Sequence, residues 1–242
     1  MKNSIEVINL SKSYKTKKAV NNISFKIDEN EIVGLLGPNG CGKTTTIGMI
    51  LGLLKPTSGQ VLINGKNIEN NKISILHKMN FISPYIELPK KLTVKQNLIV
   101  YGKLYNIKNL NERINFLSEK LRLEDLLDKI TGELSSGQKN RVSLAKALIN
   151  DPTVLLLDEP TAALDPETAD FIRTFLEKLR EEKKISVLLA SHNMDEVKRL
   201  CNSVMMMKDG NIVDGGTPED LIEKYGQKNL EEVFLEIVRK DK

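Results

Sequence analysis

Short runs of apolar residues recur along the chain and predict β-strands. Eight such runs cover residues 5–8, 23–27, 31–37, 60–65, 153–158, 185–190, 203–207 and 211–216. The runs VLLLD and SVLLA are apolar without alternation, as in strands that are buried on both faces of a sheet. The pattern therefore predicts a parallel sheet that helices cover.

Between these strands, apolar residues recur with the period of a helix. The stripes are Ile47, Ile50, Leu51 and Leu54; Ile172, Phe175, Leu176 and Leu179; and Met194, Val197, Leu200 and Cys201. Asp165 is a good N-cap for the second of these helices, because Pro166 suits the first helical position. We assign the stripes to the hydrophobic core, since none of them needs a ligand.

The middle of the chain has a different pattern of apolar residues from both ends. Residues 85–150 are mostly helical by pattern, with few strand signals. A helical subdomain inserted into an α/β core is the simplest organisation. We therefore predict a single domain over residues 1–242, with the core in 1–84 and 151–242 and the helical subdomain in 85–150.

Composition narrows the class of protein. Hydrophobic residues make up 40% of the 242 residues and charged residues 28%, which is typical of a globular protein. The net charge of +4 is slight and the lysines are scattered, so we expect no nucleic-acid partner. The two cysteines, Cys41 and Cys201, make no disulfide framework.

The sequence shows no segment that would place it in a membrane. No apolar run reaches the roughly 18–20 residues of a membrane span, and the start MKNSIEVINL lacks the apolar stretch of a signal peptide. We expect a cytoplasmic protein, unless a partner holds it at a membrane.

A glycine-rich loop follows the predicted strand at 31–37 and precedes a predicted helix. Gly37, Gly42, Lys43 and Thr44 fit the pattern G-x-x-x-x-G-K-[ST]. Glycines let the backbone N–H groups approach phosphate oxygens, and the helix N-terminus adds partial positive charge. Lys43 would reach the β- and γ-phosphates, and the Thr44 hydroxyl suits Mg²⁺. A mere strand-to-helix turn would not need this lysine. The predicted nucleotide-binding residues are Gly37, Pro38, Asn39, Gly40, Cys41, Gly42, Lys43, Thr44 and Thr45.

Cys41 lies inside this loop, beside Lys43. Backbone N–H groups and the lysine charge would favour its thiolate, and hence alkylation, if the side chain is exposed. The alternative is a small buried side chain that fits where serine or alanine would.

Two carboxylates end the predicted strand at 153–158. The end of such a strand lies at the rim of the sheet, where α/β proteins bind ligands. Asp158 suits a metal position, and Glu159 suits the group that orients or deprotonates an attacking water. A solvated strand end would be the preferred explanation without the phosphate loop, and the loop disfavours it.

The ordered set of motifs resembles the ATP-binding cassette family, the ATPase subunits of ABC transporters. The phosphate loop is followed by LSSGQ (134–138), then VLLLDEPTAALD (154–165), then SHNMDEV (191–197). The resemblance covers essentially the whole chain. It implies an α/β fold: a P-loop NTPase core with a mixed sheet, an antiparallel β edge subdomain and an inserted helical subdomain.

The resemblance implies roles for side chains outside the loop. Tyr14 matches the aromatic residue that stacks on adenine, although an ordinary surface tyrosine is an equally good interpretation. His192 matches the histidine that contacts the γ-phosphate; its place directly after a buried-type strand favours that role over a structural one. Asp165 matches an aspartate at the subunit interface, and both this role and capping are compatible.

The signature segment implies a second copy. Ser135, Gly137 and Gln138 match the residues that reach the γ-phosphate of ATP bound to another subunit, and Ser136 replaces the second glycine of the commoner LSGGQ. The implied assembly is a homodimer, or a paralogous heterodimer, with ATP and Mg²⁺ at each interface site.

One segment departs from the family pattern. The family usually has a glutamine where the chain enters the helical insert, and counting back from Leu92 places Pro84 there, with Ser83 before it. We expect slow hydrolysis in the isolated chain. The contact to a partner would then pass through Tyr85, Ile86 and Leu88.

The predicted function is ATP binding and hydrolysis that powers a separate membrane permease, by resemblance an exporter of the ABC-2 type. The expected location is the cytoplasmic side of the membrane. A soluble ABC ATPase is one alternative, and an ATP-gated module with weak hydrolysis is another. A GTPase or nucleotide kinase is disfavoured because LSSGQ has no role there.

Overall fold

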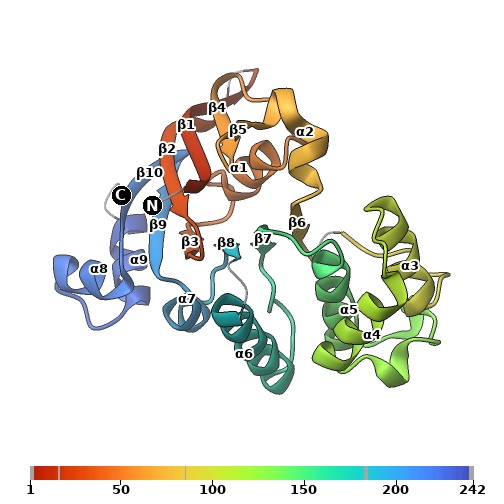
Figure 1. Ribbon diagram of the computed structural model, residues 1–242. Helices are drawn as coiled ribbons and strands as arrows, with labels where there is room; N and C mark the ends of the chain where they lie inside the picture. Colours follow the sequence, from red (N-terminus) through yellow and green to blue (C-terminus); the bar gives the residue numbers. More distant parts are fainter. Residues whose placement is uncertain (1–2, 16, 85, 183–184, 240–242) are drawn as a thin grey trace.

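A six-stranded mixed sheet forms the centre of the computed structural model, which describes residues 3–15, 17–84, 86–182 and 185–239 (Figure 1). Its strands are β3 (Ile32–Leu36), β6 (Met79–Ile82), β7 (Val154–Asp158), β8 (Ser186–Ala190), β9 (Ser203–Lys208) and β10 (Asn211–Gly216). The order is β10-β9-β3-β8-β7-β6, in which only β10 runs antiparallel to its neighbour. The expected parallel strands are therefore present.

A second, antiparallel sheet lies beside the first. It comprises β1 (Asn3–Tyr14), β2 (Lys17–Asp28), β4 (Ser58–Ile63) and β5 (Lys66–Asn67), in the order β2-β1-β4-β5. Strands β1 and β2 form a long hairpin in which Tyr14 pairs with Lys17. The mixed sheet and the antiparallel subdomain confirm the predicted α/β fold.

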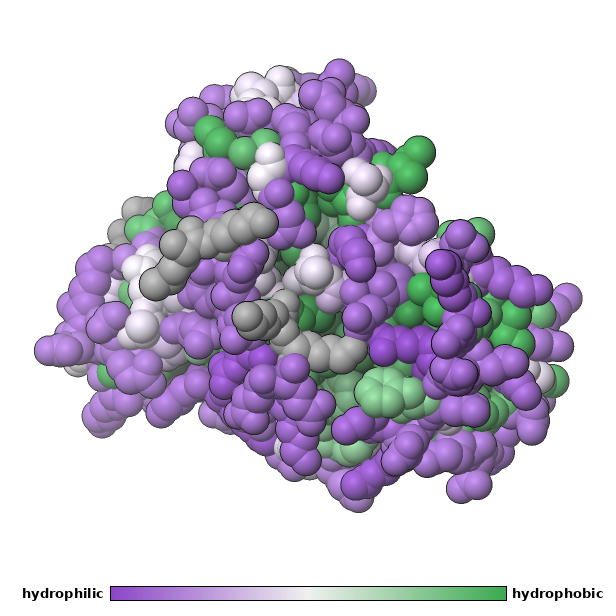
Figure 2. Space-filling model, viewed as in Figure 1, coloured by the Kyte–Doolittle hydropathy of each residue, from purple (hydrophilic) through white to green (hydrophobic). Residues whose placement is uncertain are grey.

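The parallel strands are buried on both faces, which explains their lack of alternation. On β7, Leu155 and Leu157 belong to the core that extends under the helices, whereas Val154 and Leu156 face the core between the two sheets. All four side chains are at most 1% exposed. Figure 2 shows the complementary result, a largely hydrophilic outer face with hydrophobic groups scattered over it.

Nine α-helices complete the described part of the chain. They are α1 (Lys43–Ile50), α2 (Ile68–Leu76), α3 (Val94–Leu104), α4 (Leu110–Leu121), α5 (Ser136–Leu148), α6 (Pro166–Glu182), α7 (Met194–Leu200), α8 (Pro218–Tyr225) and α9 (Leu230–Arg239), with short 3₁₀ turns at 124–126 and 131–133. In Figure 1, α3, α4 and α5 gather on one side of the molecule. No helix in the described ranges has the length and apolar character needed to cross a membrane.

Local sequence explains where α3, α5 and α6 begin. Thr93 and Gln96 form a capping box at the start of α3, and Ser135 and Gln138 form another at the start of α5. Asp165 accepts a hydrogen bond from the Thr168 N–H at 2.9 Å, so its predicted capping role is present. These caps fix where the loops that precede them end.

Candidate active site

The loop between β3 and α1 has room only for glycine at two positions. A Cβ atom added to Gly37 would lie 2.3 Å from the Met207 carbonyl oxygen. Gly42 has a φ of +113°, and a Cβ there would lie 2.5 Å from the Ala19 carbonyl oxygen. The loop therefore passes close against the backbone of β9 and β2, and only glycine avoids the clash.

Lys43 is the first residue of α1 and is almost fully buried, with 8% of its surface exposed. Its Nζ donates to the carbonyl oxygens of Gly37 at 2.6 Å and Pro38 at 3.2 Å. Within the described ranges no carboxylate forms an ion pair with it. A buried ammonium group held by neutral carbonyls suits an incoming anion.

Three segments far apart in the sequence line one cleft of about 290 Å³. Tyr14 closes the hairpin end of the cleft and is 47% exposed; its ring also lies 5.2 Å from the Lys12 Nζ. The carboxyl end of β7 contributes the opposite wall. The lining residues are Tyr14, Lys17, Ala19, Asn39, Gly40, Gly42, Lys43, Thr44, Thr45, Asp158 and Glu159.

Asp158 ends β7 inside this cleft and is 4% exposed. The Ser83 hydroxyl donates to its Oδ2 at 3.4 Å. Burial, with the nearby charge of Glu159, raises the pKa of Asp158, and the Ser83 hydrogen bond and Lys43 oppose the rise. A buried carboxylate facing a cleft together with the Thr44 hydroxyl is a donor set that fits Mg²⁺. Among described residues, no group of three or more His, Cys, Asp or Glu side chains could hold a metal ion.

Glu159 and His192 contact each other directly. The His192 Nδ1 lies 2.7 Å from the Glu159 Oε2, with side-chain exposures of 71% and 17%. Glu159 has a φ of +52°, which is uncommon for a residue other than glycine, and its N–H donates to the Ala190 carbonyl at 2.8 Å. The turn after β7 is thus anchored to the end of β8, where the His192 loop begins.

The signature residues lie apart from the phosphate-loop cleft, which none of Ser135, Gly137 and Gln138 lines. The Gln138 N–H donates to the Ser135 Oγ at 3.3 Å, and the Ser135 N–H donates back to the Gln138 Oε1 at 3.0 Å. A Cβ on Gly137 would lie 3.0 Å from the Thr168 side chain, so glycine lets α5 approach α6 closely. The capping box fixes the start of α5 outside the phosphate-loop cleft.

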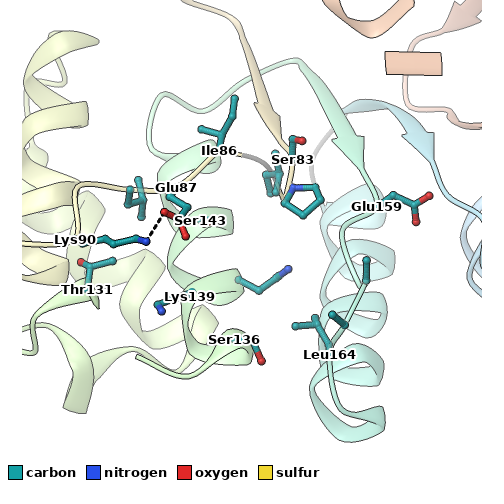
Figure 3. A pocket seen from close by; sticks show the side chains of 16 residues that line it. Ser83, Ile86, Glu87, Lys90, Thr131, Ser136, Lys139, Ser143, Glu159 and Leu164 are labelled. Atoms are coloured by element: carbon teal, nitrogen blue, oxygen red, sulfur yellow. Dashed lines mark ion pairs between the residues drawn. The ribbon is translucent and has the colours of Figure 1, made fainter. Parts of the chain in front are cut away.

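A second cleft, of about 240 Å³, separates α5 from the turn that follows β7 (Figure 3). Ser136 and Lys139 line it from α5, and Ile86 and Glu87 from the loop after β6. Glu159 borders both clefts. The carboxylate that contacts His192 therefore sits between the phosphate loop and α5.

The loop after β6 differs in part from expectation. Ile86 is 47% exposed, but Leu88 is only 6% exposed and belongs to the core with Val94 and Leu98. The expectation that Leu88 contacts a partner is therefore wrong, because its side chain already packs inside the protein. Tyr85, the third residue expected there, lies outside the described residues.

Comparison with known proteins decides the family. The family model described as "ABC transporter" matches residues 20–162. The chain belongs to the ABC transporter family. It is 34% identical over 224 residues to the "ABC transporter ATP-binding protein NatA" of Bacillus subtilis (strain 168), with 91% of each chain covered. As an ATP-binding subunit of this family, the chain is an ATPase.

Two further relatives are similar over most of their length. The "Nod factor export ATP-binding protein I" of Rhizobium johnstonii (strain DSM 114642 / LMG 32736 / 3841) is 38% identical over 222 residues, covering 91% of this chain and 71% of that protein. The ATP-binding cassette MJ0796, solved as a dimer in a post-hydrolysis state with ADP and Pi, has a TM-score of 0.80 and 28% identity, with 88% of this chain and 98% of that one covered.

Cys41 of this ABC ATPase does not have the exposed setting that alkylation requires. It is 3% exposed, and burial raises the pKa of its thiol more than the Lys43 charge lowers it. Its Sγ packs against Gly37, where it would lie 2.5 Å from an added Cβ. The expectation of a reactive thiolate is wrong, and the small buried side chain is the interpretation that holds.

Sequence reasoning missed several residues that the fold brings to the site. Lys17 and Ala19 line the cleft because β2 pairs with the strand of Tyr14; their nearness to Tyr14 in the sequence was the only available signal. Thr161 and Glu196 are buried behind the Glu159 turn. Nothing in the sequence pattern distinguishes Glu196 from an exposed residue of a helix first turn.

Proposed function

We propose that this ABC ATPase binds MgATP between two subunits and uses its hydrolysis to drive a separate membrane permease. The observation that carries the proposal is the 2.7 Å contact between Glu159 and His192 at the rim of the phosphate-loop cleft. A carboxylate and an imidazole in contact there are the groups that hydrolysis of a terminal phosphate needs.

Different residues of the cleft would bind different parts of the nucleotide. The backbone N–H groups of residues 37–45 and the Lys43 ammonium would hold the phosphates. The Tyr14 ring, exposed at the end of the hairpin, would stack on adenine. Thr44 and Asp158 would hold Mg²⁺, which when bound neutralises charge on the phosphate oxygens.

Hydrolysis would use the Glu159 carboxylate as the base. Glu159 takes a proton from water as the water oxygen bonds to the γ-phosphorus, and the bond from phosphorus to the bridging oxygen breaks, which leaves ADP and phosphate. His192 holds the Glu159 carboxylate through Nδ1 and keeps it turned toward the cleft rim. The strained φ of Glu159 supports a positional role for this residue.

A second subunit would complete each site. Ser135, Gly137 and Gln138 lie outside the cleft of their own chain, so their expected contact with a γ-phosphate requires another copy. The similar MJ0796 cassette is a dimer. Either two identical chains or this chain with a paralogue would satisfy the geometry, with Asp165 near the subunit interface.

The permease would contact the cleft beside the helical subdomain, from the cytoplasmic side of the membrane. Ile86 is exposed at its edge, where a membrane subunit's helix could cover it (Figure 3). Similarity to Nod factor export proteins supports an exporter. The net charge is slight and the lysines are scattered, which argues against a nucleic-acid partner. The helical subdomain would begin at residue 85 and end at residue 150.

One observation favours a second candidate, an ATP-gated module that hydrolyses slowly. Pro84 stands at the position where the family usually has a glutamine, and the side chain that contacts Asp158 is that of Ser83, the residue before it. Its hydroxyl has a shorter reach than a glutamine amide, so a water at the metal would be held less firmly. This candidate differs from the first only in the rate of hydrolysis.

The test compares two variants of the purified chain. Glu159→Gln should retain ATP binding, lose about 10²–10⁴-fold in hydrolysis and elute as a dimer with MgATP in size-exclusion chromatography. Lys43→Ala should lose both binding and hydrolysis. A Glu159→Gln protein that stays monomeric with ATP demonstrably bound would contradict the shared site, and one that hydrolyses at the wild-type rate would contradict the assigned base.

A further inference from the structure

A buried carboxylate lies behind the two loops that carry Glu159 and His192. Glu196 is in the first turn of α7 and is 0% exposed. Its N–H donates to the side chain of Asn193, the N-cap of α7, at 3.1 Å. The residue is therefore fixed at both its backbone and its side chain, although it does not line either cleft.

The two carboxylate oxygens of Glu196 contact different loops. The Thr161 hydroxyl donates to Oε1 at 2.7 Å, and the Ser191 hydroxyl donates to Oε2 at 2.6 Å. Thr161 follows Glu159 by two residues, and Ser191 directly precedes His192. One buried side chain thus links the two loops whose outer ends meet in the Glu159–His192 contact.

The burial of this carboxylate is costly, which argues that it has a task. No lysine, arginine or histidine of the described ranges forms an ion pair with it. Burial raises its pKa, while the Ser191 and Thr161 hydrogen bonds and the charge of Arg173 act against this. An apolar residue would fill such a position at lower cost if packing were the only requirement.

A backbone hydrogen bond also joins the two loops. The Glu159 N–H donates to the Ala190 carbonyl at 2.8 Å, which holds the two loops at one point. This hydrogen bond lies at the end of the β7–β8 pairing, where Asp158 pairs with Ala190, so it does not hold the residues further along the loops. The bridge through Glu196 supplies a second point of attachment, two residues along one loop, and so fixes their relative orientation.

We propose that Glu196 is a positioning residue for ATP hydrolysis, which keeps the loop of Glu159 and the loop of His192 in a fixed relation. The proposal rests on the roles given above to these two residues. Glu196 itself touches neither water nor phosphate in this scheme, and acts only through Thr161 and Ser191.

Glu196→Ala in the full chain is the first test, with Asp195→Ala as the matched control on the exposed side of the same turn. Loss of the bridge should lower kcat about 10–100-fold, since small displacements of reacting groups have effects of this size. The dissociation constant for ATP should stay within about twofold, because the phosphate loop is not touched.

An NMR spectrum of the labelled histidines reports directly on the surroundings of His192. The chain has two histidines, His77 and His192, so ¹³C-labelled histidine gives one reporter at the site and one internal control. Glu196→Ala should move the His192 signal and leave the His77 signal in place. Thr161→Ala should produce part of the same shift and should not add to Glu196→Ala, because both remove one bridge.

Glu196→Gln is the control for the possibility that Glu196→Ala does not fold. The amide keeps the size of the side chain and can bond both hydroxyls, so this variant should fold and retain more of kcat than Glu196→Ala. An unmoved His192 signal, or an unchanged kcat, in a folded Glu196→Ala protein would overturn the proposal. Failure of the proposed function is separate, since it would appear as wild-type hydrolysis in Glu159→Gln whatever Glu196 does.

Discussion

The Ser83 Oγ lies 3.4 Å from the Asp158 Oδ2, so the ends of β6 and β7 are linked by one hydroxyl at the rim of the sheet. Ser83 directly precedes Pro84, which stands where the family usually has a glutamine. Because Pro84 has no side-chain acceptor, the Ser83 hydroxyl is the polar group beside it that reaches Asp158, and its reach is shorter than that of a glutamine.

Ser83→Ala should slow hydrolysis about 2–10-fold, the effect of one hydrogen bond worth roughly 0.5–1.5 kcal/mol. It should also raise the Mg²⁺ concentration needed for half-maximal activity, because the hydroxyl no longer steadies the Asp158 carboxylate. Ser74→Ala, on the exposed face of α2, is the control. Equal rates and equal Mg²⁺ dependence in both variants would show that Ser83 has no part in the site.

The predictable and unpredictable parts of this fold have physical causes. The strands at β7 and β8 are evident from sequence because both of their faces are buried. Strand β6 has no pattern signal: it has four residues, and the side-chain amide of its buried Asn80 donates to distant partners, Tyr105 and Asn150. Such tertiary hydrogen bonds leave no trace in local periodicity.

The site shows the same division. The phosphate loop is predictable because close backbone approach requires glycine at fixed spacing, as at Gly37 and Gly42. The burial of Leu88 is not predictable because it lies in an irregular loop with no periodicity, and only the fold places it in the core that α3 shares. The Glu196 bridge joins residues 35 positions apart, so only the folded chain shows it.

Asp158→Asn should stabilise the protein in the absence of nucleotide and metal. Burial raises the pKa of Asp158, so the folded protein binds a proton more readily than the unfolded chain. Its free energy of unfolding therefore falls as the pH rises from the unfolded pKa through the folded one, and this deficit persists at neutral pH. Asparagine does not ionise and avoids the deficit.

Thermal unfolding at several pH values measures this effect. At pH 7 the Tm of Asp158→Asn should exceed that of the wild type, and the difference should shrink as the pH falls. Asp128→Asn, an exposed position, should change the Tm little at any pH. A lower Tm for Asp158→Asn at pH 7 would mean that the apo protein gains more from the charge than burial takes away. Hydrolysis should be lost in Asp158→Asn in either case.

Both cysteines should react slowly in the native protein. Cys41 is 3% and Cys201 8% exposed, and burial raises the pKa of each thiol, so little thiolate is available to attack a reagent. Titration with a disulfide reagent should release two equivalents only after unfolding. If one thiol reacts rapidly in the native protein, and if this reaction is absent from Cys41→Ala and blocked by ATP, then Cys41 is an exposed thiolate after all.

The loop after β6 offers two substitutions of similar size that should differ in their effect on stability. Leu88 is buried in the same core as Val94 and Leu98, so Leu88→Ala should lower the free energy of unfolding by about 2–5 kcal/mol. Ile86 is 47% exposed beside the cleft, so Ile86→Ala should change the Tm little. The basal ATPase rate of the purified Ile86→Ala chain should also stay close to that of the wild type, since the side chain is not part of the phosphate-loop cleft.

The consequence of Ile86→Ala should appear only where the permease is present. In cells that make the protein with its own membrane subunit, the tagged Ile86→Ala chain should be recovered less in the membrane fraction than the wild type, because an apolar contact to the membrane subunit is lost. Ile73→Ala, at an isoleucine on α2 that is more exposed than Ile86 and borders neither cleft, is the matched control. If Ile86→Ala instead abolishes basal hydrolysis in a folded protein, the loop serves the active site directly and the permease contact lies elsewhere. Normal membrane recovery with normal hydrolysis would equally remove Ile86 from the contact.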